Sequence, residues 1–226
     1  MKETTPLELG KVELINESLA DKVYNLLDTG ILNMQFLPGT SLNEDEIASS
    51  LKVSRSPVRE ALLRLEHVGL VRKDRKSRVV ASITQESILN NYQMWAMAES
   101  YGAGLACQYA TTRDIMAIRD HMRQMNRFIC ADSAKQYREL NYQLHTLLVT
   151  PCRNSSLLEC HRNALNHIRW GYNYTLNYTE DIDHSNQEHN EIFKAYCAQD
   201  SATVERLIRK HIDDVSARVQ AAFSQD

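Results

Sequence analysis

The sequence has few residues that would interrupt regular structure. It contains four prolines and seven glycines in 226 residues, and it has no low-complexity run. Collagen-like and disordered chains are far richer in glycine or proline, so both classes are excluded. The composition predicts a chain that is mostly helical, and its length suits two modest domains or one large one.

Long apolar runs and paired cysteines are also missing. The most apolar window, residues 94–107, is broken by Glu99 and is too short to cross a bilayer. The five cysteines are odd in number, and no CxxC pair occurs among them. The first residues are polar and contain no apolar core for export. We therefore expect a cytoplasmic protein with reduced thiols, no membrane association and no disulfide scaffold.

The charge of the chain is distributed unevenly. The whole chain has a formal net charge of −3, but residues 52–78 contain nine lysines and arginines against three acidic residues. This segment has a balance of +6, which leaves −9 for the remaining residues. A basic segment beside an acidic remainder is typical of a protein in which one domain binds DNA.

The most informative motif lies within this basic segment, at residues 53–65. Ser54 stands where its side chain can cap a helix, and Pro57 falls in the first turn, where a missing N–H is tolerated. Apolar residues then recur at helical spacing and predict a buried face of Val58, Ala61, Leu62 and Leu65. The arginines that point away from this face suit guanine bases and phosphates, and they are Arg55, Arg59 and Arg64. The alternative is an ordinary surface helix with solvated arginines.

The flanking segments favour a DNA-binding module. Residues 42–51 predict a short helix, and Lys52 and Val53 form a tight turn before the next helix, as in a helix-turn-helix. Gly69 ends that second helix, and residues 70–73 and 78–81 read as the strands of a wing with a basic tip. A helix over residues 18–33 precedes them. We expect a flexible arm at 1–13, a winged helix-turn-helix at 14–82 and a second domain at 83–226.

The second domain is predicted to be an all-helical bundle, because no segment after residue 83 reads as a strand. Thr84 is a suitable N-cap for a long helix that ends near Ala110. Further helices are expected at 112–129, 133–149, 154–176, from 185 or 186 to 198, and from 200 or 201 to 223, with an acidic loop at 179–185. The fold class is therefore mainly α, with a small β-hairpin in the first domain.

Three histidines of the second domain each lie on an apolar helix face: His145, His189 and His211. One such histidine is usually a core residue with a satisfied hydrogen bond, but three from separate helices are costly unless something organises them. A divalent cation does so. Asn141 shares the face of His145, because it lies four residues earlier. The three histidines predict a metal site, with Zn²⁺ as the first candidate and Ni²⁺ or Mn²⁺ as alternatives, and the resemblance given below adds Asn141 to its ligands. Their neutral side chains would leave the ion its double charge and favour an anionic effector.

The first domain resembles the winged helix-turn-helix of the GntR family of bacterial transcription regulators. The resemblance is carried by residues 38–42, 54–65 and 66–71. One departure is the wing, which reads Arg75-Lys76-Ser77 without the glycine that is usual in the family. A charge contact from this wing is therefore expected in place of a backbone contact in the minor groove.

The second domain resembles the FCD ligand-binding domain of the FadR subfamily. The resemblance rests on the order Asn141-x3-His145, then His189, then His211. It implies a metal held by one aspartate and three histidines, whose coordination a carboxylate effector completes. Asn141 replaces the aspartate in this chain. The family often has an arginine four residues before a glutamate of the first long helix. This chain has Trp95 four residues before Glu99.

These features predict a metabolite-responsive transcription regulator, with repression as the expected mode. A homodimer would place two recognition helices in successive major grooves of a palindromic operator, and the effector would be a small carboxylate or sugar acid. The expected DNA contacts are Ser54, Arg55, Ser56, Arg59, Arg64, Lys73 and Lys76. The expected effector contacts are Trp95, Glu99, Tyr142, Asn166 and Arg169.

A metal-dependent enzyme is the alternative function. A catalytic zinc needs an open coordination position and a placed general base. Glu188 adjoins His189 but is expected to point to another face of the helix, and no nucleophile-and-base pair stands out. The sequence therefore favours a regulator that is not an enzyme.

Overall fold

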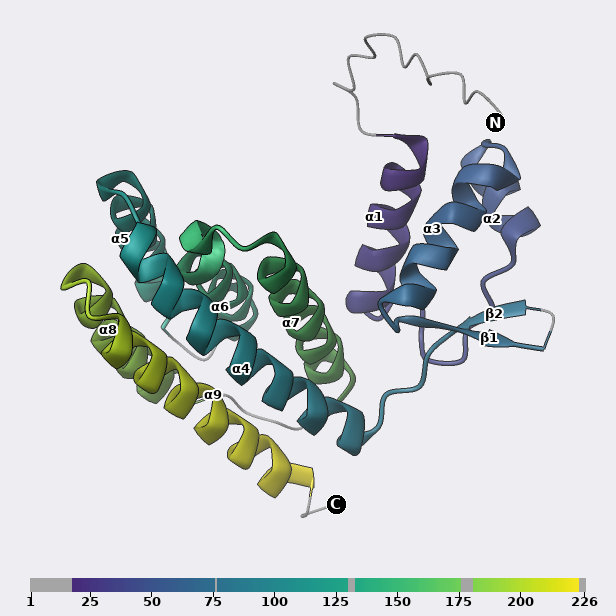
Figure 1. Cartoon of the computed structure of the whole chain (residues 1–226). Coiled ribbons are helices and arrows are strands. Elements are labelled where there is room, and N and C mark those ends of the chain that lie inside the picture. Colours follow the sequence, from purple (N-terminus) through teal and green to yellow (C-terminus); the bar gives the residue numbers. More distant parts are fainter. Residues whose placement is uncertain (1–17, 76, 130–132, 176–180, 224–226) are drawn as a thin grey trace, which may run out of the picture. The chain divides into compact units, whose positions relative to one another are not determined.

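The computed structural model in Figure 1 describes residues 18–75, 77–129, 133–175 and 181–223. These residues form two units, one of residues 18–31 and 39–81 and the other of residues 32–38 and 82–223. The expected N-terminal arm lies outside the described residues. Among the helices that the structure describes, none combines the length and the apolar character needed to cross a membrane.

The first unit contains helices α1 (Leu19–Leu32), α2 (Glu44–Leu51) and α3 (Arg55–His67). α2 follows Asn43, whose side chain accepts hydrogen bonds from the N–H groups of Asp45 and Glu46. Lys52 adopts the left-handed conformation with φ 55° and turns the chain toward α3. The buried face of α3 consists of the four predicted residues, Val58, Ala61, Leu62 and Leu65.

A hairpin completes the first unit. Strands β1 (Val71–Asp74) and β2 (Ser77–Val80) pair antiparallel, with Val71 opposite Val80. The segment before α2 also bonds to β2, because the Gly39 and Leu42 N–H groups donate to the carbonyls of Val80 and Arg78. The wing is thereby tied to the helices. Gly69, at φ 81°, supplies the left-handed turn that ends the recognition helix.

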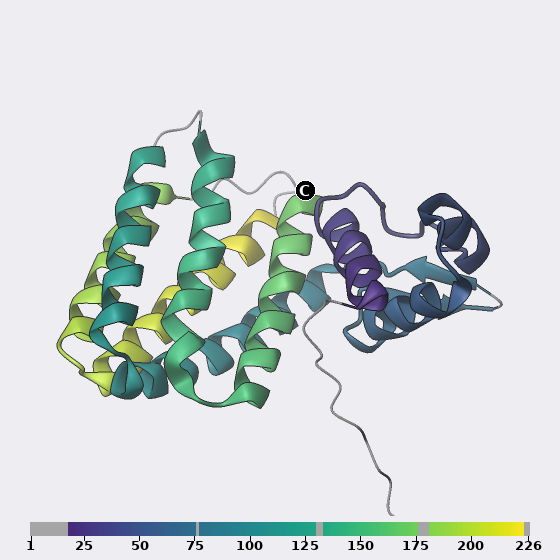
Figure 2. The same ribbon diagram turned by 90° about the horizontal axis from the view of Figure 1, so that it is seen from above.

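The second unit is an all-helical bundle, so the predicted fold class is confirmed. It contains α4 (Gln85–Tyr109), α5 (Thr112–Met125), α6 (Ala134–Val149), α7 (Ser155–Thr175), α8 (Ile182–Cys197) and α9 (Ser201–Phe223). Short 3₁₀ turns, η1 (Asn126–Phe128) and η3 (Thr150–Cys152), follow α5 and α6. α4 packs along α9 and α7 and also contacts α6, and Figure 2 shows α9 crossing behind the layer of α5, α6 and α7. α4 is therefore the helix around which the bundle is built.

Small residues allow this close packing of α4. Ala103 and Ala106 are fully buried, and a Cβ atom at Gly104 would collide with the Glu205 side chain of α9. A larger residue at position 104 would therefore displace that side chain. The other half of the helix carries Trp95 and Glu99, which are both buried.

Two predicted helix boundaries are wrong. The acidic loop expected at 179–185 ends early, because α8 begins at Ile182 and the Asp181 side chain caps it by accepting a bond from the His184 N–H. α5 ends at Met125 and does not reach Ile129, because its last turn tightens into η1. Ser54 occupies the N-cap position of α3, but its side chain makes no capping bond.

Candidate nucleic-acid interface and candidate metal centre

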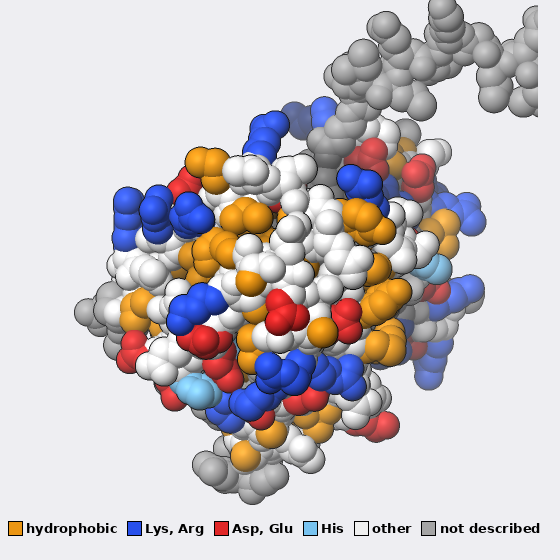
Figure 3. Space-filling view, turned by 60° about the vertical axis from the view of Figure 1, so that its left-hand side comes forward, with side chains coloured by type: hydrophobic (Ala, Val, Ile, Leu, Met, Phe, Trp, Pro, Cys, Tyr) orange, Lys and Arg blue, Asp and Glu red, His pale blue; other side chains and the backbone are white. Residues whose placement is uncertain are grey.

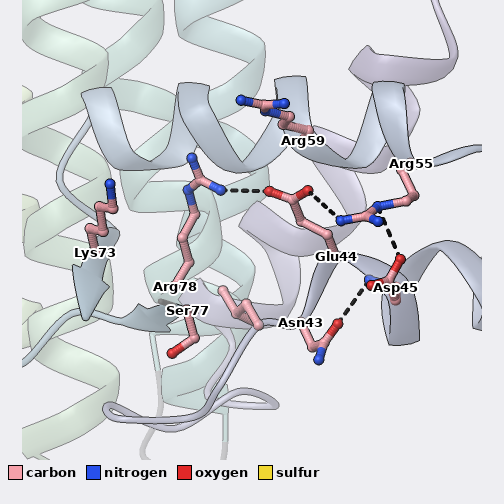
Figure 4. Close-up of a pocket in the computed structure, with 9 residues that line it drawn as sticks. Asn43, Glu44, Asp45, Arg55, Arg59, Lys73, Ser77 and Arg78 are labelled. Carbon is pink, nitrogen blue, oxygen red and sulfur yellow. Dashed lines mark hydrogen bonds and ion pairs between the residues drawn. The ribbon is translucent and has the colours of Figure 1, made fainter. Parts of the chain in front are cut away.

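A concave surface of about 390 Å³ lies between α2, α3 and the hairpin. It is lined by Arg55 and Arg59 of α3 and by Lys73 of β1, three of the residues expected to contact DNA. Figure 4 shows Arg55 and Arg59 on one helix and Lys73 on the hairpin beside it. Lys76, also expected to contact DNA, lies outside the described residues.

The Arg55 side chain folds back onto the start of α2. Its Nε atom lies 3.0 Å from Asp45 Oδ1, and its Nη2 atom lies 3.7 Å from Glu44 Oε2. Both Arg55 and Asp45 are 65% exposed, so water and salt weaken the pair. Arg59 makes no ion pair with the residues drawn in Figure 4. Neighbouring acids therefore offset the charge of Arg55, whereas none of the acids drawn in Figure 4 pairs with Arg59.

Arg78 joins the hairpin to both helices of the motif. Its Nη1 atom lies 2.7 Å from Glu44 Oε1, and its Nε atom lies 2.9 Å from Glu66 Oε2. The Arg78 side chain is only 17% exposed, so its pairs are better shielded from water than that of Arg55. Sequence reasoning gave Arg78 and Glu44 no role, because charge patterning does not show which side chains meet across three elements.

The remaining expected DNA contacts are divided. Ser54 and Ser56 are exposed at the start of α3, where the positive end of the helix dipole favours phosphate. Arg64, in contrast, pairs with Asp21 of α1 at 2.6 Å, and its guanidinium lies 4.3 Å from the centre of the Tyr24 ring. The structure therefore places Arg64 against α1 and away from the concave surface.

The structure brings His145 of α6, His189 of α8 and His211 of α9 together inside the bundle. All three are buried, and one ring nitrogen from each lies within 4.8 Å of the others. The Nε2 atoms of His189 and His211 are 3.3 Å apart. Two nitrogens at zinc-bond distance in a tetrahedral site lie about 3.3 Å apart. The three histidines therefore fit a divalent metal ion.

Carboxylates bind the outer nitrogens of two of these histidines. Glu99 Oε1 lies 2.5 Å from His145 Nδ1, and Glu188 Oε2 lies 2.7 Å from His211 Nδ1. A carboxylate at Nδ1 accepts a hydrogen bond from the Nδ1–H group. The lone pair of Nε2 then remains available for a metal. His145 Nε2 is buried and has no hydrogen-bond partner among the described residues, which agrees with a ligand role.

Glu99 is held by three donors from three helices. Besides His145, its carboxylate receives the Trp95 Nε1–H at 2.5 Å and lies 2.8 Å from His161 Nε2. Burial alone would raise the pKa of Glu99, but the charges and hydrogen bonds of His145 and His161 outweigh it and lower the pKa to about 2. Glu99 is therefore an ionised carboxylate with no exposed surface.

Two of the three histidines, His189 and His211, are favoured in their neutral form. Burial lowers the pKa of His189 well below its usual value, and the neighbouring His211 and His145 lower it further. Burial also lowers the pKa of His211, against the opposing effect of Glu188. Neutral imidazole is the form that binds metals, so the interior is prepared for one at neutral pH.

A small cavity of about 30 Å³ reaches this cluster. His145 and His211 form part of its lining, together with Asn141, Trp95 and Tyr142. Asn141 is buried one turn before His145 on the same face of α6. The cavity therefore brings Asn141, Trp95 and Tyr142 beside two of the three histidines, whereas His189 is not part of its lining.

The other expected effector contacts lie elsewhere. Glu99 sits behind His145 and is not part of the cavity lining. Asn166 and Arg169 line a separate, more open depression of about 460 Å³ with Tyr142. Arg169 also pairs there with Glu139 at 2.9 Å.

Sequence reasoning missed Arg138 and His161. Arg138 lines the cavity beside the histidines, and its position three residues before Asn141 placed it on the ligand face, so helical spacing could have found it. His161 contacts Glu99 from α7, and no spacing within one helix reveals such a contact.

Both units match families of known proteins. Residues 19–80 match the bacterial regulatory proteins of the gntR family, and residues 91–214 match the FCD domain. The chain is similar to the Nta operon transcriptional regulator of Aminobacter aminovorans, with 29% identity over 86% of this chain and 93% of that protein. It is also similar to the HTH-type transcriptional repressor RspR of Escherichia coli strain K12, with 23% identity over 96% of this chain and 94% of that protein.

A solved structure supports the fold. E. coli McbR/YncC superposes with a TM-score of 0.77 and 18% identity, over 92% of this chain and 100% of that chain. At this identity the likeness extends to the arrangement of the helices and hairpin and not to the ligand.

Proposed function

The chain belongs to the GntR family of bacterial regulatory proteins and carries an FCD domain after its helix-turn-helix, and we propose that it is a metal-dependent repressor that a small carboxylate releases from DNA. The family makes the protein a transcriptional regulator with a DNA-binding unit and an effector-binding unit. Beyond the family, we propose that the protein belongs to the FadR subfamily, that it represses transcription, and that it binds a divalent metal and a small carboxylate. The relative RspR is named a repressor, which supports repression as the mode of regulation.

The observation that carries the proposal is the convergence of His145, His189 and His211. Two of these histidines have a carboxylate at Nδ1, and a cavity opens onto the cluster. Asn141 offers a fourth ligand, although an amide oxygen adds no charge and binds more weakly than a carboxylate. A Zn²⁺, Ni²⁺ or Mn²⁺ ion held there would supply an electrophilic position for a carboxylate oxygen.

The proposed reading of DNA assigns bases to Arg55 and Arg59. Arginine at the start of a recognition helix suits guanine O6 and N7. Ser54, Ser56 and Lys73 would contact phosphates, because they are exposed on or beside the same concave surface. Lys76 keeps its expected role at the wing tip. Arg64 is the weakest of the proposed contacts, since Asp21 already pairs with it.

A homodimer on a palindromic operator completes the proposal. α4 carries an exposed row of apolar side chains, Met94, Met97 and Tyr101, at 43%, 52% and 53% exposure. Their spacing puts them on one face of the helix, and we propose that a second copy covers them. Figure 3 shows that hydrophobic side chains are exposed among charged ones on the face it draws. Interfaces commonly combine exposed apolar side chains with a polar surround.

The effector would act by shifting a population. Its cavity is lined by residues of α4, α6, α7 and α9, so a bound molecule contacts four helices of the bundle at once. It can change DNA binding only to the extent that it binds one arrangement of the dimer more tightly than the other. A repressor results if the arrangement that binds the effector does not fit the operator spacing.

The enzyme alternative has little support. Glu188, the carboxylate nearest to His189 in sequence, reaches across to His211 Nδ1. It therefore supports a ligand and does not stand free as a general base. The families that match the chain are regulators.

The test combines metal analysis with operator binding. Protein isolated without chelator is expected to contain about one divalent ion per chain, and His189→Ala is expected to lose it. An operator selected from a random DNA pool should be released by a small carboxylate from the metal-loaded wild type but not from His189→Ala. His121→Ala, at a half-buried histidine outside the cluster, is the matched control and should behave as wild type. Wild-type protein without metal, or release that is unchanged in His189→Ala, would contradict the proposal.

A further inference from the structure

The chemistry of the effector can be narrowed from the cavity beside the histidines, on the premise of the metal-dependent sensing proposed above. The free space of about 30 Å³ holds a group of about the size of one water molecule. His145 and His211 line this space. A carboxylate group can therefore approach the histidines, whereas the rest of the effector must find room among the surrounding side chains.

Two carboxylates change the charge of this site. Glu99 and Glu188 lie one hydrogen bond behind His145 and His211. Their negative charges reduce the positive charge that a divalent ion presents to an anion, although Lys210, at 3.7 Å, offsets part of the charge of Glu188. The sequence had suggested that neutral ligands would leave the ion its full charge. With these carboxylates in place, a further cation beside the site would strengthen the attraction of an anion.

Arg138 supplies that cation. Among the described residues that line the cavity, it alone carries a fixed positive charge. Its guanidinium lies 3.8 Å from the centre of the Tyr172 ring, and its Nε atom is buried with no hydrogen-bond partner among the described residues. Stacking holds the plane of a guanidinium while its N–H groups stay available. This arrangement suits the two-point binding of a carboxylate.

The rest of the lining is mostly apolar or aromatic. Its aromatic and aliphatic members are Tyr92, Trp95, Tyr142, Ile168, Tyr172 and Val215, and Asn141 adds one amide. The indole N–H of Trp95 is already bonded to Glu99. A sugar acid would bring several hydroxyl groups to a wall whose polar groups are this amide and the tyrosine hydroxyls, and every buried hydroxyl left without a partner is costly. A flat apolar body meets no such cost.

We propose that Arg138 binds the carboxylate of the effector and that this effector has a flat, apolar or aromatic body and is not a sugar acid. Arg138 and Tyr172 are half-buried, so the proposal places the entry of the body beside these two side chains.

The test uses calorimetric titration of the full-length, zinc-loaded protein with benzoate, benzamide and gluconate. Benzoate is expected to bind at least about tenfold more tightly than gluconate, and benzamide, which has the same body without the charge, at least about tenfold more weakly than benzoate. Arg138→Gln should weaken benzoate binding by at least about tenfold. Arg123→Gln is the matched control, because Arg123 is a 70% exposed arginine of α5 outside the cavity lining, and it should stay within about twofold. Arg138→Lys keeps the charge and should recover part of the affinity, and circular dichroism shows that each variant is folded.

The outcomes separate this inference from the proposed function. Gluconate binding as tightly as benzoate would overturn the effector class, and equal benzoate affinity in Arg138→Gln and wild type would overturn the role of Arg138. Metal-dependent sensing survives either result. Benzoate binding that is unchanged after chelator treatment would contradict the metal but leave the Arg138 comparison valid. If none of the three compounds binds the wild type, the inference fails, and a wider carboxylate screen then decides the proposed function.

Discussion

The two units of the protein use charge in opposite ways. In the first unit, the pair of Arg55 and Asp45 lies at the surface with both side chains 65% exposed. In the second, Glu99 has no exposed surface and binds three donors. A surface pair contributes little to stability and is easily exchanged for another partner, whereas a buried carboxylate is tolerated only while its donors stay in place. The first arrangement suits a surface that must release one partner to take DNA, and the second suits permanent support of a ligand site.

The largest expected effect comes from breaking the buried network. Glu99→Leu leaves the Trp95, His145 and His161 donors without an acceptor, so the free energy of unfolding of the metal-free protein should fall by about 3–5 kcal/mol. Urea titration measures it. Glu191→Ala removes an exposed carboxylate that pairs with Lys194 at 2.6 Å, and it should change stability by less than about 1 kcal/mol. Equal effects of the two substitutions would mean that the burial of a charge, on which the contrast between the units depends, makes no difference to stability.

A smaller effect is expected from the surface arginine that faces DNA. Arg55→Ala should weaken operator binding by about 1–3 kcal/mol and relax specificity at one base position, while the stability of the protein stays nearly constant. Fluorescence anisotropy at fixed salt measures the affinity. Arg123→Ala, at a 70% exposed arginine of α5, is the control. Unchanged operator affinity in Arg55→Ala would remove this residue from the interface.

Acidification should affect the second unit selectively. Burial lowers the pKa of His189 and His211 in the folded state, so the unfolded chain binds more protons below its histidine pKa of 6.5. The metal-free protein should therefore be most stable above that pH and lose stability as the pH falls toward 5, by about 1.4 kcal/mol per unit of pKa difference. The contribution of Glu99, whose pKa is about 2, is retained over this range.

Chemical denaturation at pH 7.5, 6 and 5 checks this expectation. His189→Gln cannot take up the proton and should flatten the dependence. The same slope in His189→Gln and wild type would assign the pH effect to other groups.

The smallest effect is expected at Asp45. Asp45→Asn removes the acid that holds Arg55 and a negative charge near the phosphates, so operator affinity should rise by about 0.5–1 kcal/mol. Asp120→Asn removes a 66% exposed acid from α5 and should leave the affinity unchanged. Weaker binding in Asp45→Asn would mean that this acid positions Arg55 and does not compete with DNA.

The sequence predicted those features that depend on neighbours along one element. The buried face of α3 and the shared face of Asn141 and His145 follow from helical spacing. The start of α8 was wrong because the capping role of Asp181 was overlooked. Glu99 was expected to contact the effector, but its partners come from α4, α6 and α7, and nothing in their separate patterns shows that these three faces meet.

The histidine cluster also has a consequence for the topology of the chain. His189 and His211 are 22 positions apart, and His145 lies 44 positions before His189. A metal ion bound by all three histidines would close two consecutive loops of the chain, as a pair of disulfides would. These loops would remove conformations from the unfolded ensemble. Loading of the cluster would therefore make α6, α8 and α9 resist proteolysis as a single cross-linked block, whatever molecule occupies the cavity.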